Sequence, residues 1–471
     1  MEGKMNRNQF MEKLIKDYTS KNKKSGKIFD EASRYQIRGG SHNLRLFPPF
    51  PIYADKCRGS KIWDADGNAV VDFWQGHFAN ILGHNPPVVT RKLHHLFQSG
   101  LGLETGYPEK NQRKLAELIL SRTMAEKIRF TTSGTLASMY AVMLAKAYTR
   151  KEKVLKTGGG WHGAHPYVLK GISSYKKGLN QIESSGLPPG AGSMTLVVRF
   201  NDIEHLEAVF QSHAERIACF IIEPFIGAGG FIFASREYLK KARELTRKTG
   251  TVLIFDEVVS GFRFHAGPVQ NFYGISPDLT IFGKAVGGGM PVSAVAGSRD
   301  ILSLCSPEAD KKDRVKFEGG TFSGHPASMA AGAAYIQHLI NHESEIYPRI
   351  GRWGKRIRKT IERIFSSHGF NVKCTGDGGK TAENSSLIGV QFLRRNLDKV
   401  TTPEQVWNPE ISDVELREKA LKLALLEEGF NTFHGFGAVS AAHSEDEVQG
   451  ALDAVERIAQ KWKQWGVLDW L

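Results

Sequence analysis

The stretch Thr251-Val252-Leu253-Ile254-Phe255-Asp256-Glu257-Val258 decides the fold class of this 471-residue chain. A continuous apolar run is typical of a strand buried on both faces of an α/β sheet. Ligands in open α/β sheets bind beyond the carboxyl ends of the strands, where Asp256 stands. The pattern therefore places Asp256 at a binding site, although a structural acid that caps the next element explains this residue alone equally well.

A second buried strand is predicted at Leu279–Phe282, and it runs into Gly283-Lys284-Ala285. A lysine among small residues at a strand end is either a nucleophile with a lowered pKa or a phosphate-binding lysine. A Walker A loop requires glycine at position 278 and Ser or Thr at position 285, but this chain has Asp278 and Ala285. The nucleotide-binding interpretation is therefore excluded.

A third motif, Thr131-Thr132-Ser133-Gly134-Thr135, leads from a predicted strand into a predicted helix. Backbone N–H groups and hydroxyls at a helix N-terminus form an anion site that suits a phosphate. Ser and Thr are also ordinary N-cap residues, so the motif alone leaves both interpretations open.

Further short apolar runs alternate with helical patterns, which indicates an α/β sheet that is mostly parallel. An Asp66-Gly67 pair between two apolar runs predicts a hairpin. The other predicted strands are Ile128–Thr132, Val154–Thr157, Thr195–Phe200, Ala218–Ile222 and Val292–Ala296.

Three regions are expected along the chain. Residues 1–72 form an amino-terminal segment that joins a smaller domain, residues 73–325 form the large cofactor-binding domain, and residues 326–471 form the small α+β domain. Helical patterns dominate 326–368 and 411–428, and Ser444 with Glu447 predicts a capping box for a last helix. The Gly/Pro-rich segment 173–193 is either a lid or a surface insertion.

Composition narrows the class of protein. The net charge is +14, of which the first 28 residues contribute +5, and no aromatic-interleaved basic segment suggests nucleic-acid binding. The four cysteines are far apart, which favours a reducing compartment. No signal peptide or membrane span is recognisable, so we expect a cytoplasmic enzyme with no membrane or nucleic-acid partner.

One cofactor requires a lysine, a buried acid and a phosphate cradle together, namely pyridoxal 5′-phosphate (PLP). The ordered motifs resemble the class III aminotransferases of PLP fold type I, in the branch that holds glutamate-1-semialdehyde aminomutases and β-amino-acid transaminases. The resemblance runs from about Gly39 to Ile458. It rests on T-S-G-T, W-H-G, F-D-E-V, T-I-F-G-K-A-V-G-G-G-M-P and G-G-T-F-S-G-H-P.

The resemblance implies a role for each matched residue. Lys284 would form the Schiff base with the cofactor and carry the proton, and Asp256 would pair with the pyridinium. Contacts to the rest of the cofactor would come from Ser133, Gly134 and Thr135 at the phosphate and from Val258 and Trp161 at the two ring faces.

Two further roles extend beyond the cofactor pocket of one chain. Thr321 would reach the phosphate of the neighbouring subunit, which makes a homodimer part of the active site. Arg45 would bind a substrate carboxylate, although a surface arginine is an alternative interpretation. His162 and Arg263 are expected to be structural.

The expected reaction is amino transfer from an amino acid or amine to an oxo acceptor, with glutamate-1-semialdehyde 2,1-aminomutase as the alternative. Leu136, Ala228 and His434 depart from the aminomutase pattern, which has Glu, Asn and an acid at the corresponding places. These departures favour a transaminase.

Overall fold

The computed structural model describes residues 4–173 and 178–471. It is built around a seven-stranded sheet in the order β4-β12-β11-β10-β7-β5-β6. Only β12 runs antiparallel to its neighbours β11 and β4. The strands are β4 (Lys127–Thr131), β5 (Lys153–Thr157), β6 (Thr195–Val198), β7 (Ile217–Ile222), β10 (Val252–Glu257), β11 (Leu279–Phe282) and β12 (Ser293–Gly297).

Both faces of this sheet are covered by helices. Along β7, Cys219 and Ile221 pack with α6 (Gly134–Thr149), whereas Phe220 and Ile222 pack with α8 (Ile203–His213) and α9 (Arg236–Thr249). Because successive side chains of a strand point to opposite faces, an all-apolar strand is buried on both sides. The predicted strands and the mostly parallel α/β architecture are confirmed.

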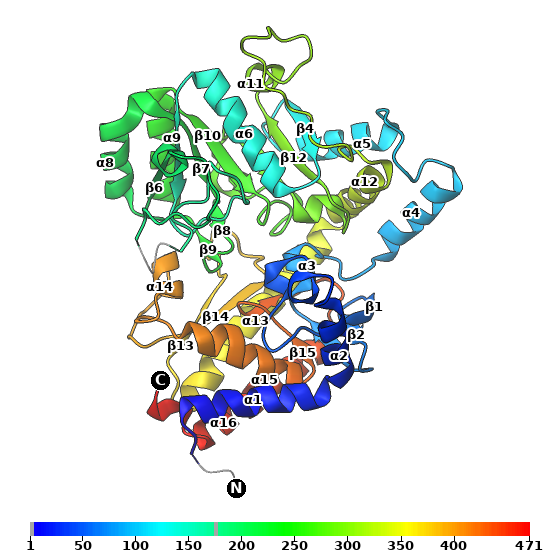
Figure 1. Cartoon of the computed structure of the whole chain (residues 1–471), viewed down its shortest axis with the longest axis vertical. Helices are drawn as coiled ribbons and strands as arrows, with labels where there is room; N and C mark the ends of the chain where they lie inside the picture. Colours follow the sequence, from blue (N-terminus) through cyan, green and yellow to red (C-terminus); the bar gives the residue numbers. More distant parts are fainter. Residues whose placement is uncertain (1–3, 174–177) are drawn as a thin grey trace.

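The amino- and carboxyl-terminal segments lie together below the large sheet in Figure 1. Helix α1 (Arg7–Lys21) packs on α15 (Leu421–Glu427), and β3 (Ala69–Asp72) pairs in parallel with β15 (Phe430–Asn431). The predicted hairpin is present as β2 (Lys61–Asp64) and β3. With β1 (Ala54–Arg58) these strands form a four-stranded sheet.

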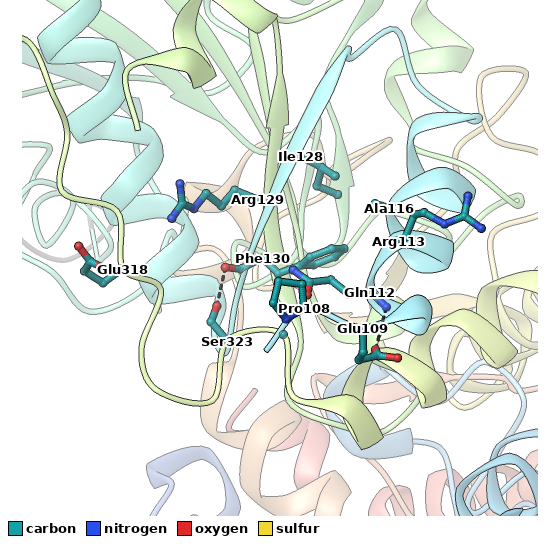
Figure 2. A pocket seen from close by; sticks show the side chains of 11 residues that line it. Pro108, Glu109, Gln112, Arg113, Ala116, Ile128, Arg129, Phe130, Glu318 and Ser323 are labelled. Atoms are coloured by element: carbon teal, nitrogen blue, oxygen red, sulfur yellow. Dashed lines mark hydrogen bonds between the residues drawn. The ribbon is translucent and has the colours of Figure 1, made fainter. Parts of the chain in front are cut away.

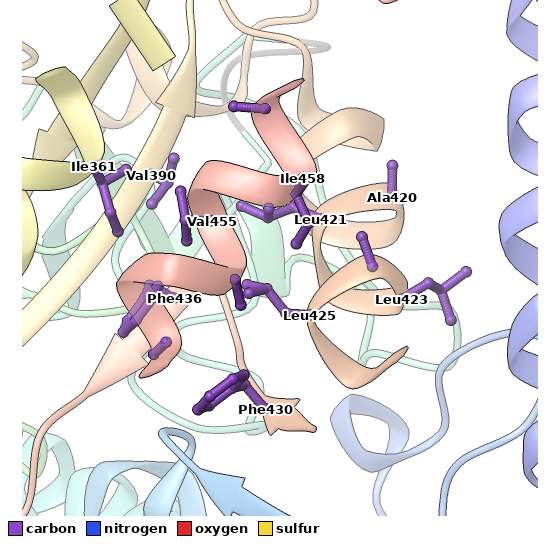
Figure 3. Close-up of a cluster of buried hydrophobic side chains, with 14 of the residues drawn as sticks. Ile361, Val390, Ala420, Leu421, Leu423, Leu425, Phe430, Phe436, Val455 and Ile458 are labelled. Atoms are coloured by element: carbon purple, nitrogen blue, oxygen red, sulfur yellow. The ribbon is translucent and has the colours of Figure 1, made fainter. Parts of the chain in front are cut away.

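A three-stranded sheet completes this half of the molecule. It contains β13 (Val372–Thr375), β14 (Leu387–Phe392) and β16 (Gly435–Ala438), all antiparallel. Helices α13 (Glu343–Ser367) and α16 (Glu445–Gln464) pack against each other, and Figure 3 shows the buried apolar side chains between α15, α16 and the strands. Helix α16 begins with the predicted Ser444–Glu447 capping box.

Helix α12 (Pro326–Asn341) packs on α4 (Pro87–Gln98) and α5 (Lys110–Leu120), which lie beside the seven-stranded sheet. The expected boundary at residue 326 groups α12 with the small domain, whereas this packing favours a boundary nearer α13. The Gly/Pro-rich segment forms a bridge between Lys170 and Ile182. Residues 174–177 within it lie outside the described residues, so its function as a lid stays a prediction. Among the described residues, none of the helices is long and apolar enough to span a bilayer.

Candidate active site

The residues predicted to carry chemistry meet at one edge of the seven-stranded sheet. Strands β4, β5, β7, β10 and β11 are parallel to one another, so their carboxyl ends share this edge. Asp256 is the penultimate residue of β10, opposite Ile281 of β11, and Lys284 lies two residues after the end of β11. The parallel topology therefore brings distant motifs into one place.

Asp256 is buried, with 4% of its surface exposed. Its Oδ1 accepts a hydrogen bond from the Val258 amide at 3.0 Å, and its Oδ2 lies 2.9 Å from His162 Nδ1. Burial lowers the pKa of His162 and outweighs the opposing influence of Asp256. His162 is therefore neutral near pH 7, and its Nδ1–H donates to the carboxylate.

Lys284 is half-buried and has a left-handed backbone, with φ of 48°. Such a conformation costs about 1 kcal/mol or more in a non-glycine residue, and it is common at functional sites. Burial lowers the pKa of Lys284, while the charges of Asp256 and Glu223 oppose the shift. A lysine with a lowered pKa has more of the neutral, nucleophilic amine at neutral pH.

Val258 connects the lysine segment with the start of α6. A Cβ added to Gly134 would stand 3.3 Å from Val258 Cγ2, and one added to Gly283 would stand 3.1 Å from Val258 Cγ1. Ser133 caps α6 by accepting a hydrogen bond from Leu136 N. The amides of the first helical turn have no carbonyl partner within the helix, so this end suits an anion.

The Trp161 segment crosses over the same helix end. Gly163 has φ of +92°, and a Cβ there would lie 2.6 Å from Thr135 Cα. Ala164 N donates to Thr135 Oγ1 at 3.3 Å. The Trp161 side chain is 45% exposed, and its backbone N–H donates to Glu223 Oε1 at 2.9 Å.

Glu223 is a buried acid that follows β7 at this edge. Its Oε2 also accepts a hydrogen bond from Gly227 N at 2.9 Å. Burial, together with the charge of Asp256, raises the pKa of Glu223 to about 8. The carboxyl group thus fixes the segments 161–163 and 223–227 relative to each other.

The opposite wall comes from an unusual left-handed turn, α3 (Gln75–Phe78), whose four residues have φ between 49° and 67°. Three of them are not glycine, and each costs roughly 1–2 kcal/mol in this conformation. Asp72 holds the entry of the turn by accepting hydrogen bonds from Trp74 N at 2.9 Å and Gln75 N at 3.0 Å.

Arg263 holds the exit of the same turn. It is fully buried, and its guanidinium donates to Phe78 O at 3.1 Å, Ser386 Oγ at 3.0 Å and Val439 O at 3.2 Å. Arg263 is therefore structural, as expected, and it joins the large sheet to the carboxyl-terminal strands.

The left-handed turn presents His77 to Arg45. Arg45 Nε donates to His77 Nε2 at 3.2 Å, and the His42 and His77 ring centroids are 4.7 Å apart. The turn Gln75–Phe78 packs against the segment Lys284–Gly287, and the Lys284 charge contributes to lowering the pKa of both imidazoles. Arg45, which the sequence predicts to bind a substrate carboxylate, thus lies at the site.

An aromatic wall continues from His77 towards the carboxyl-terminal segment. Trp74 stacks on Phe433 at 5.0 Å, Phe433 contacts His434 at 4.2 Å, and His434 contacts Trp407 at 5.7 Å between ring centroids. His434 Nδ1 lies 3.0 Å from Glu418. Burial opposes ionisation of Glu418, but the charges of His434 and Arg417 prevail and lower its pKa to about 2.

Thr321 is exposed on the segment before α12, at the outer edge of β4. Beside it Ser323 Oγ donates to Phe130 O at 2.6 Å, as Figure 2 shows. A cavity of about 500 Å³ lies here, between β4, the start of α5 and residues 318–324. This cavity is separate from the edge that carries Asp256 and Lys284.

Sequence reasoning missed three members of this site. His162 was expected to be a satisfied loop residue, but it contacts Asp256. His77 and Glu418 were not singled out, because their partners Arg45 and His434 lie 32 and 16 residues away. A histidine directly after Trp161 in the W-H-G motif was the available clue for His162.

Known proteins match this chain along most of its length. Residues 45–378 match the family Aminotransferase class-III. The glutamate-1-semialdehyde 2,1-aminomutase of Methanosphaera stadtmanae is 33% identical over 92% of this chain and 97% of its own. The chain therefore belongs to the class III aminotransferases.

Solved structures agree with this assignment. An omega-transaminase from Sphaerobacter thermophilus superposes with a TM-score of 0.83 at 29% identity, over 93% of this chain and 97% of that one. A beta-phenylalanine aminotransferase from Variovorax paradoxus gives 0.84 at 26% identity, over 98% of both chains. The fold is that of the PLP-dependent enzymes, and the protein is a PLP-dependent enzyme.

The residues at the sheet edge fit this cofactor. They supply an amine with a lowered pKa, a buried carboxylate with its own hydrogen-bond partner, and a helix N-terminus for the phosphate. Val258 lies between the lysine segment and the helix end, where an apolar surface suits a flat ring.

Proposed function

We propose that this protein is a transaminase that takes the amino group from a donor bearing a carboxylate and an apolar side chain. PLP supplies the electron sink for this chemistry. The observation that carries the proposal is the convergence of Lys284, Asp256 and the α6 N-terminus around Val258.

Each residue of the sheet edge has a distinct task in this proposal. Lys284 bonds the cofactor and moves the proton at the substrate carbon. Asp256, aligned by His162, keeps the ring nitrogen protonated. Ser133, Gly134 and Thr135 bind the phosphate, while Val258 and Trp161 cover the two ring faces.

The substrate-facing wall supports a transaminase over the aminomutase. Arg45 provides the cation for the carboxylate, and the aromatic wall of Trp74, Phe433 and Trp407 suits an apolar group. At the position where aminomutases carry Asn, Ala228 offers only its carbonyl, which accepts from Trp407 Nε1 at 3.0 Å. The aminomutase is the second candidate, favoured by the names of relatives such as the 33% identical one.

The active form in this proposal is a homodimer. Tyr107 and Phe322 are 79% and 59% exposed, and each directly adjoins a residue that lines the cavity of Figure 2. Large apolar side chains clustered at one surface are typical of a protein interface. A second copy there would bring its Thr321 to the phosphate. The four free cysteines support a reducing compartment such as the cytoplasm.

A visible absorption titration of the PLP-loaded enzyme tests the reaction class. We expect bleaching of the cofactor band by 3-amino-3-phenylpropanoate or another carboxylate-bearing apolar donor, with formation of the corresponding oxo product. A response confined to 4,5-diaminovalerate would instead establish the aminomutase. Absence of a cofactor band after PLP is added would refute both.

A further inference from the structure

We propose that His77 is a positioning residue that orients Arg45 for a substrate carboxylate, an inference that rests on the proposed function. Arg45 lies on a short exposed segment, η2 (Asn43–Arg45), so its long side chain needs a fixed partner to hold one geometry. The described structure gives it one hydrogen-bond partner, His77 Nε2, at 3.2 Å from Arg45 Nε.

The choice of nitrogen matters for what Arg45 can bind. An arginine binds a carboxylate through two parallel N–H bonds. Because His77 takes the Nε–H, the two Nη groups at the tip of the guanidinium remain for the ligand. A carboxylate partner at the same place would neutralise the guanidinium, whereas a neutral imidazole accepts the hydrogen bond and leaves the positive charge in place.

His77 itself is held in place by the strained turn that contains it and by two neighbouring rings. It stands at φ of 60° in the left-handed turn Gln75–Phe78, which Asp72 fixes at one end and Arg263 at the other. Its ring lies between Trp74, at 4.5 Å, and His42, at 4.7 Å between centroids. Strained backbone at a site is maintained only when its surroundings determine it. Here the strained turn directs the imidazole at Arg45.

The protonation of His77 is consistent with an acceptor role. Burial, and then the charges of His42, Arg45, Lys284 and His434, lower its pKa to about 3. The hydrogen bond from Arg45 therefore persists throughout the neutral range, since Nε2 keeps its lone pair.

A binding experiment with an unreactive carboxylate tests the role without requiring turnover. The probe is 3-phenylpropanoate, titrated into the PLP-loaded wild type and variants, with 3-phenylpropanol as the uncharged control ligand. We expect His77→Phe, which keeps a ring but has no acceptor, to weaken binding of the acid about tenfold, equivalent to about 1.4 kcal/mol. Binding of the alcohol should be unchanged.

Further variants distinguish the hydrogen bond between His77 and Arg45 from the packing of the His77 ring. His77→Gln restores an acceptor and should stay within about threefold of the wild type. Arg45→Ala should abolish the preference for the acid, and adding His77→Phe to it should have no further effect. Arg363→Ala, which removes an exposed charge on α13, is the matched control and should leave binding unchanged.

Several results would overturn the inference. These are an unchanged affinity in His77→Phe, an equal loss in His77→Gln, additive losses in the double variant, or no binding of the acid by the wild type. The cofactor absorption band is recorded in each sample and reports on the proposed function separately, because its absence concerns Lys284 and not His77.

Discussion

At the scale of single residues, the chemistry depends on which groups the sheet edge places beside the cofactor. Asp256 and Lys284 could be predicted because each stands at or just beyond the carboxyl end of a buried strand, after an apolar run. His162 could not, since the contact with Asp256 joins residues 94 positions apart. Its pairing depends on the tertiary structure, as does the pairing of Glu418 with His434.

Replacing Asp256 by Asn tests whether its carboxylate is required for the reaction. The carboxylate that stabilises a protonated ring nitrogen would be lost, so we expect the rate of the donor half-reaction to fall at least about a thousandfold, or about 4 kcal/mol. His162→Phe should lower the rate by about tenfold, because Asp256 keeps the hydrogen bond from Val258 N but loses the one from His162. Stopped-flow measurement of the cofactor absorbance gives both rates.

The matched control is Asp278→Asn. This carboxylate lies at the amino end of β11, where it accepts from Arg243 Nη1 at 2.9 Å and Leu253 N at 2.7 Å. It belongs to the same sheet but to the opposite edge. An equal loss of rate in Asp278→Asn would show that the Asp256 effect is only structural.

At the scale of elements, the strands and the capping box of α16 were predictable, because continuous apolar runs and Ser-x-x-Glu spacing are local signals. The left-handed turn Gln75–Phe78 was not. Only Gly76 in it favours positive φ, and the turn is held at Gln75 by Asp72 and at Phe78 by Arg263. Tertiary hydrogen bonds therefore stabilise this conformation, although the non-glycine residues of the turn prefer negative φ.

A pair of glycine variants tests the phosphate cradle. Gly163→Ala would place a methyl group 2.6 Å from Thr135 Cα, so we expect the start of α6 to shift and PLP affinity to drop at least about tenfold. Gly250→Ala has a similar positive φ of +62° but no atom within 4 Å of the new Cβ. It should cost about 1 kcal/mol of stability without changing the affinity. Equal PLP affinities in the two variants would contradict the cradle, and fluorescence titration measures them.

At the scale of the whole molecule, the order of motifs indicated the fold type, but not how segments far apart in sequence pack together. The site needs the large sheet, the turn after β3 and the segment around His434 at once. Helix α12 illustrates the difficulty, because its helical pattern was clear while its partners α4 and α5 lie some 200 residues earlier. The position of α12 is determined by its packing in the folded core and not by its own sequence pattern.

The proposed homodimer is tested by Phe322→Asp. A charge at this exposed apolar position would oppose burial against a second copy, so we expect sedimentation to report monomers and PLP to bind more weakly, since the partner's contribution to the phosphate site is lost. Tyr148→Asp, on an aromatic side chain 51% exposed at the far end of α6, is the control. A Phe322→Asp protein that stays dimeric with full PLP affinity would contradict the interface.

The central claim is that Lys284 is the residue that bonds the cofactor, and it is tested most directly by borohydride reduction followed by peptide mass mapping. Lys156 provides an internal comparison, because it is also buried, donates to Thr157 O and Lys170 O, and has its pKa lowered by burial to about 7. We predict a pyridoxyl group on the peptide that contains Lys284, and none in Lys284→Ala. A stable adduct on Lys156 or any other lysine of the wild type, or one that survives in Lys284→Ala, would contradict the account.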